Sequence, residues 1–120
     1  MIIGACTIEL SLPGVNSLKG KRKVVRSVLD KLRARFNVAA AEVDALDVHR
    51  RAILGLAVVS NDGRHANSMI DTLVSFVANT ADAVVVGHRL EIVRAAEGGY
   101  LDPIGLELRD PPGGDWDGEG

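Results

Sequence analysis

Cysteine and aromatic residues are scarce in this sequence of 120 residues. The single cysteine, Cys6, can form neither an internal disulfide nor a CxxC zinc site, which fits a reducing compartment. No apolar run approaches the ~18 residues of a membrane helix, and the N-terminus lacks the charged and apolar regions of a signal peptide. We therefore expect a cytoplasmic protein with no membrane association, long enough to bury a core without disulfides or metal.

Motifs for catalysis are also missing. The sequence contains no Walker loop, no GxGxxG and no Ser-His-Asp order. The densest group of potential metal ligands comprises Glu42, Asp44, Asp47 and His49, but its spacing matches no zinc or calcium motif. We interpret these residues as a charged edge hairpin that resists aggregation. The sequence thus predicts no catalytic residue, no metal and no cofactor, and an enzyme is the least favoured hypothesis.

Hydrophobic periodicity predicts six elements. Residues 2–12 alternate between apolar and polar positions, as a half-buried strand does. Ser17 is a natural N-cap for a helix that runs to about Arg35. Strands are then predicted at residues 36–45, 51–60 and 81–95, with a second helix, capped by Asp62, at residues 64–79.

The resulting order, β-α-β-β-α-β, is that of the α+β ferredoxin-like fold. Right-handed crossovers place both helices on one face of a four-stranded antiparallel sheet, with the first and third strands central. We expect this domain to cover residues 1–95. The remaining residues, 96–120, are rich in Gly, Pro and acidic side chains, so we expect a mobile C-terminal tail. The part beyond about Arg109 is expected to be dispensable for folding.

Positive charge is concentrated in the first predicted helix. Residues 19–35 hold eight Lys or Arg against one acid, Asp30, although the net charge of the chain is −2. Cations near a helix N-terminus oppose the helix dipole, and here they are not interleaved with acids as i,i+4 pairs. Such a conflict with local stability is typical of functional sites. The candidate anion-binding residues are Lys19, Lys21, Arg22, Lys23, Arg26, Arg33 and Arg35.

Two interpretations of this cluster stay open. A charged helix face is often only solvated surface, whereas a helix N-terminus with free amides and several cations suits phosphate groups. A helical wheel places Lys19, Lys23, Arg26 and Arg33 in one arc that faces solvent. The expected anion is the RNA backbone, bound with little sequence preference because no base-reading residues accompany the charges.

The sheet face opposite the helices is predicted to be small and aliphatic. No aromatic residue lies in the first or third predicted strand, so base stacking of the kind used by RNA-recognition motifs is disfavoured. The side chains expected on this face include Ala57, Val59, Val85 and Gly87. We expect this open sheet face, or an edge strand, to pair with a second copy in a homodimer.

Two blocks of the sequence, SLKGKRKVVRSVLDKLRARFNVAAAEVD and RAILGLAVVSND, resemble the signature of the YlxP-like family of uncharacterised bacterial proteins. The resemblance spans about residues 2–95. It implies a ferredoxin-like domain, no established enzymatic activity, and a gene often found beside those for translation initiation factor two and ribosome-binding factor A. The positions that fall within the family's basic motif are Lys19, Lys21, Arg22, Arg26 and Arg35.

Two functional hypotheses follow. The first is a non-catalytic accessory factor in translation or ribosome maturation, whose partner is RNA or a ribosomal particle. The second is a homo-oligomeric module that binds an anionic metabolite. They differ in footprint, because RNA needs an extended stripe of charge whereas a metabolite needs a concave site with converging polar groups.

Overall fold

The computed structural model describes residues 1–80 and 82–95 of the chain. The tail expected at residues 96–120 lies outside the described residues. No helix in the described part is long and apolar enough to span a membrane. The elements are β1 (Ile2–Ser11), α1 (Leu18–Arg35), β2 (Ala39–Asp44), β3 (Arg51–Ser60), α2 (Gly63–Ala78) and β4 (Val84–Arg94).

Both helices begin at the predicted caps. The Oγ of Ser17 accepts a hydrogen bond from the backbone N–H of Gly20 at 3.0 Å, and the Oδ1 of Asp62 accepts one from Arg64 at 2.9 Å. Each bond satisfies one of the amides that a helix leaves unpaired at its first turn. The capping prediction is confirmed for both helices.

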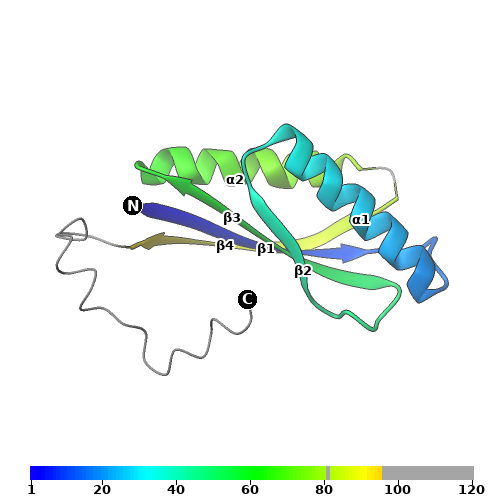
Figure 1. Cartoon of the computed structure of the whole chain (residues 1–120). Helices are drawn as coiled ribbons and strands as arrows, with labels where there is room; N and C mark the ends of the chain where they lie inside the picture. Colours follow the sequence, from blue (N-terminus) through cyan, green and yellow to red (C-terminus); the bar gives the residue numbers. More distant parts are fainter. Residues whose placement is uncertain (81, 96–120) are drawn as a thin grey trace, which may run out of the picture.

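The four strands form one antiparallel sheet in the order β2-β3-β1-β4, so β1 and β3 are central as predicted. Both helices lie on the same face of this sheet (Figure 1). The ferredoxin-like βαββαβ prediction is therefore confirmed, and it follows from the alternating strands and the right-handed crossovers.

The core fills the space between the sheet and the two helices. Alternate residues of β1 and β3 point into it, while the residues between them point to the open sheet face. Burying each of these aliphatic side chains stabilises the fold by about 1.5–3 kcal/mol relative to exposure. The largest apolar side chains that are fully buried are Ile8, Leu10, Leu12, Leu32, Leu54, Ile70 and Leu73.

Two register shifts change which side chains face outwards. In the β1–β4 pair, Glu9 lies opposite Gly87 but Leu10 lies opposite Val85, so Val86 is an extra residue. Val85 consequently packs against the core, and the prediction that it lies on the open sheet face is wrong. A second shift, in β2, leaves Val43 without a partner.

Candidate nucleic-acid interface

Four exposed cations of α1, namely Lys19, Arg22, Lys23 and Arg26, form a cluster that we call the basic patch. They line one surface hollow together with Ser27, Asp30 and Lys31. These residues share a side of the helix because positions three and four apart are neighbours on a helix surface. The structure thus brings together four of the seven predicted anion-binding residues.

The charge of the basic patch is not compensated by the described part of the chain. None of its four cations forms a salt bridge with another described residue. Asp30, the acid in the same hollow, has its Oδ1 3.6 Å from the Nη1 of Arg33 instead. The first turn of α1 contains no acidic residue, so the side-chain charges add to the positive end of the helix dipole.

Lys31 lies in the same hollow but was not among the residues predicted from sequence. A signal for it was present, since Lys19, Lys23, Ser27 and Lys31 follow one another at i,i+4 spacing. The sequence argument selected the cations near the helix N-terminus and the two arginines at its other end, and passed over Lys31 between them. The hollow extends over about 18 Å of helix axis, given 1.5 Å per residue from Lys19 to Lys31.

Lys21 departs from the sequence prediction. Its side chain is fully buried, and its Nζ lies 2.7 Å from the Oε2 of Glu42. The same Nζ donates hydrogen bonds to the backbone oxygens of Val48, at 2.7 Å, and Ala45. An ammonium enclosed in this way cannot reach a phosphate in solvent, so Lys21 does not belong to the basic patch.

The helical spacing explains why Lys21 is buried. Leu18, Lys21, Val25, Val28 and Leu32 succeed one another at steps of three and four, which is the stripe that faces the sheet. The sequence argument assigned Lys21 to the exposed cations because lysine is almost never fully buried unless it is paired. The partner, Glu42, came from a distant strand and could not be inferred from local spacing.

The three contacts of Lys21 hold the connection between β2 and β3, and we call this group the lysine clamp: Lys21, Glu42 and the backbone oxygens of Ala45 and Val48. The Oε2 of Glu42 receives no hydrogen bond from any other described residue, so Lys21 alone compensates its burial. Ala45 adopts a left-handed conformation, with φ 58°, which the clamp on its carbonyl helps to maintain.

Arg33 and Arg35 are separated from the basic patch by contacts of their own. The Nη2 of Arg33 donates to the backbone oxygen of Ala40 at 2.6 Å. The guanidinium of Arg35 lies 5.2 Å from the ring centroid of Phe76 and 6.0 Å from that of Phe36, which is within the range of cation–π attraction. These two residues stabilise the end of α1 and are not gathered with the patch.

The acidic group considered as a metal site is used differently in the structure. Glu42 belongs to the lysine clamp, and the Oδ1 of Asp44 accepts a hydrogen bond from the backbone N–H of Ala45 at 2.7 Å. Over residues 1–80 and 82–95, no three His, Cys, Asp or Glu side chains are grouped to hold a metal ion. The two carboxylates therefore shape the turn after β2.

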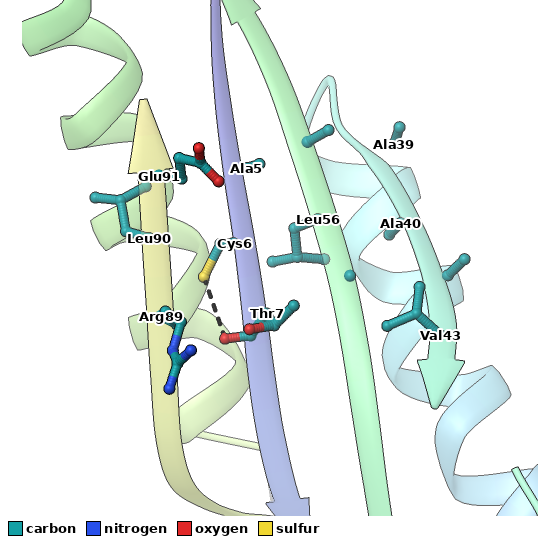
Figure 2. Close-up of a pocket in the computed structure, with 13 residues that line it drawn as sticks. Ala5, Cys6, Thr7, Ala39, Ala40, Val43, Leu56, Arg89, Leu90 and Glu91 are labelled. Carbon is teal, nitrogen blue, oxygen red and sulfur yellow. Dashed lines mark hydrogen bonds between the residues drawn. The ribbon is translucent and has the colours of Figure 1, made fainter. Parts of the chain in front are cut away.

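The open sheet face carries a shallow trough with a floor of small residues (Figure 2). Ala5, Gly55 and Ala57 lie side by side across β1 and β3, while Val43 forms one wall. A Cβ at Gly55 would lie 2.8 Å from the Cγ1 of Val43, so only glycine lets that side chain cover β3. Such a trough, without aromatic residues in its lining, offers no surface for base stacking.

Cys6 is buried on the helix-facing side of β1 and is not a reactive thiol. Burial raises the pKa of the Cys6 thiol above its ordinary value. A thiol with a raised pKa holds little thiolate at neutral pH, and the thiolate is the nucleophilic form. Cys6 therefore acts as a small hydrophobic core residue, as its position in the sequence pattern predicts.

Taken together, these features define a small ferredoxin-like protein with a basic helix and no recognised catalytic group among its described residues. Residues 3–90 match the family model described as "Protein of unknown function (DUF503)", and the chain belongs to this family. The uncharacterized protein YlxP of Bacillus subtilis (strain 168) is 28% identical over 76 residues, which cover 63% of this chain and 83% of that protein. The predicted YlxP-like resemblance is thus confirmed.

The fold is also seen in a de novo designed protein whose solution NMR structure is described as having a ferredoxin fold. The TM-score is 0.51 with 12% sequence identity, and the match covers 85% of this chain and 95% of the designed one. At such low identity the likeness concerns the fold alone.

Proposed function

We propose that this chain is a non-catalytic accessory factor of translation or ribosome maturation that contacts RNA phosphates through the basic patch. One observation carries the proposal: four exposed cations gather at the N-terminal half of α1 with no acidic partner in the described part of the chain. The ribosomal setting rests on the gene association implied by the family resemblance. The proposal assumes a cytoplasmic location.

The shape of the patch favours a nucleic-acid backbone over a small anion. Its cations and Lys31 extend over about 18 Å of helix axis and line an open hollow to which only α1 contributes residues. A single phosphorylated metabolite would engage one end of that length, whereas a chain of phosphates can follow it. No aromatic side chain lines the hollow, so bases have no stacking surface there, which supports weak sequence preference.

Salt dependence of RNA binding tests this proposal. If all four cations each neutralise one phosphate of a single-stranded RNA, the logarithm of the association constant falls by about 2.8 per tenfold rise in salt. Fluorescence anisotropy with a labelled 20-nucleotide RNA at several salt concentrations gives this slope. The triple variant Lys19→Glu, Lys23→Glu, Arg26→Glu is expected to lose binding and co-sedimentation with ribosomal particles.

A matched pair of single variants separates the patch from net charge. Lys23→Glu and Arg64→Glu change the charge of the chain equally, but Arg64 lies exposed at the start of α2 and outside the patch. Only Lys23→Glu should weaken binding and reduce the slope, by about 0.7. Equal losses in both variants, or no RNA binding by the unaltered chain at low salt, would contradict the proposal. Binding of a phosphorylated metabolite without RNA would favour the metabolite hypothesis.

A further inference from the structure

β4 is an edge strand whose outer side has no strand partner in the described part of the chain. It is 11 residues long, and its exposed apolar side chains include Val84, Val86 and Ile92. Long edges with exposed apolar residues tend to pair with another strand. The opposite edge, β2, has only six residues. The register shift of β4 lies near its start, at Val86, and the pairing with β1 is regular from Gly87 to Arg94, so β4 offers the longer template for pairing.

The charges of β4 are arranged as a self-complementary set. Arg89 lies opposite Thr7 and Glu91 opposite Ala5 in the sheet register, which places both charges on the open sheet face. Figure 2 shows these two side chains on β4 with Leu90 between them. Leu90 lies opposite the buried Cys6, so it belongs to the helix-facing side. Neither Arg89 nor Glu91 forms a salt bridge with another described residue.

We propose that β4 pairs antiparallel with β4 of a second copy of this chain, about a two-fold axis that passes through Leu90. In this register Arg89 of each copy lies directly opposite the partner subunit's Glu91, so the axis creates two opposite-charge pairs on one sheet face. The four-stranded sheets then join into one eight-stranded sheet, with an isologous interface.

The register is selected by charge and by the pleat. Directly opposite residues of antiparallel strands have their side chains on the same face of the sheet. A two-fold axis that keeps all helices on one side of the joined sheet therefore sets one residue of β4 opposite the same residue of the partner strand. An axis through Arg89 would place two arginines opposite each other, and an axis through Glu91 two glutamates. Of these neighbouring positions, only Leu90 opposes arginine to glutamate.

The position of α2 is compatible with this pairing. α2 packs against both β1 and β4, and a Cβ at Gly63, its first residue, would lie 3.9 Å from the Cγ2 of Ile92. α2 also contacts β3, the strand on the other side of β1, so it is centred over β1. With strands about 4.8 Å apart, an axis beside β4 places the two α2 helices about 14 Å apart. Packed helices lie 8–10 Å apart, so the two α2 helices would not collide as the sheets join.

Charge reversal tests the proposed dimer. Sedimentation of the full chain at micromolar concentration is expected to give twice the chain mass of 12.7 kDa. Arg89→Glu and Glu91→Arg, made singly, each place like charges opposite one another twice and should raise the dissociation constant of the dimer at least about tenfold. The double variant, which exchanges the two charges, should restore it.

A mixing experiment identifies the register. Arg89→Glu chains mixed with Glu91→Arg chains should form heterodimers, since each variant supplies the charges that the other lacks. Circular dichroism of each variant checks that the fold persists, as expected for exposed side chains. A monomeric unaltered chain, single variants that dimerise as before, or a mixture that stays monomeric would each overturn the proposed pairing.

Discussion

Lys21 shows how much one side chain can differ from its neighbours in α1. It lies in the same stretch of sequence as the basic patch and has the same residue type as two of its members, yet it is fully buried against Glu42 and two backbone oxygens. Its ammonium stabilises the connection between β2 and β3, whereas the exposed cations beside it stabilise nothing in the described fold. Residue type alone therefore does not tell the structural lysine from the candidate binding residues.

Lys21→Met should strongly destabilise the fold. The substitution keeps the volume of the stem but leaves the buried Oε2 of Glu42 without its partner, which lowers the free energy of unfolding by up to about 3–5 kcal/mol. Lys21→Met combined with Glu42→Leu should recover part of the loss, since it removes the orphaned charge while two carbonyls remain unpaired. Urea denaturation measures these changes, with Lys19→Met as the exposed control. A single variant as stable as the control would show that the clamp contributes little.

As an element, α1 combines a stabilising inner face with an unfavourable outer one. Val25, Val28 and Leu32 pack into the core, and Ser17 caps the first turn. The cations of the outer face interact unfavourably with the dipole of the same helix. The helix is therefore less stable than it would be with neutral or acidic residues in its first turns, a conflict that is typical of functional sites. This trade-off leads to opposite effects on folding and on binding.

Lys19→Glu should make the fold more stable while weakening RNA binding. An acidic residue in the first turn of α1 interacts favourably with the helix dipole, with an effect of about 0.3–1 kcal/mol at low salt. Thermal unfolding of the variant should shift to higher temperature, and the shift should shrink as salt is added. RNA anisotropy of the same sample should show weaker binding. A variant that is less stable than the unaltered chain would contradict the dipole argument.

The sequence predicted the elements well because each has a clear period and a clear start. Ser17 and Asp62 act as caps, and the central strands alternate or are apolar throughout. The two register shifts were not predictable, because nothing local to Val43 or Val86 distinguishes an extra residue from a paired one. Four of the predicted site residues come together in the basic patch, while Lys21 depends on a partner that only the folded sheet supplies.

At the scale of the whole molecule, the two proposals make a joint prediction about long RNA. Joining the sheets through β4 leaves α1, which packs against β2, on the outer part of each half. The two basic patches would then lie on the same side of the sheet, about 30 Å apart when counted in strand spacings. A dimer with two such patches can bind one long RNA at both ends.

Arg89→Glu should therefore weaken binding to a 40-nucleotide RNA at least about tenfold, since the variant loses the second patch of the dimer. Its affinity for a 10-nucleotide RNA should change little, because each patch remains intact. Anisotropy with both RNAs tests this, and the charge-exchanged double variant serves as the control. Equal losses on the two RNAs would indicate that Arg89 itself contacts RNA.

The burial of Lys21 also determines how the chain responds to covalent chemistry. All four lysines of the sequence lie in α1, and three of them, Lys19, Lys23 and Lys31, are exposed. Acetylation, which removes the charge of an amine it can reach, would neutralise these three and spare the enclosed fourth. The lysines that acetylation can reach and the buried lysine that stabilises the fold therefore lie on different faces of α1. A modifying enzyme could neutralise the three exposed lysines, while the fold keeps Lys21 out of its reach.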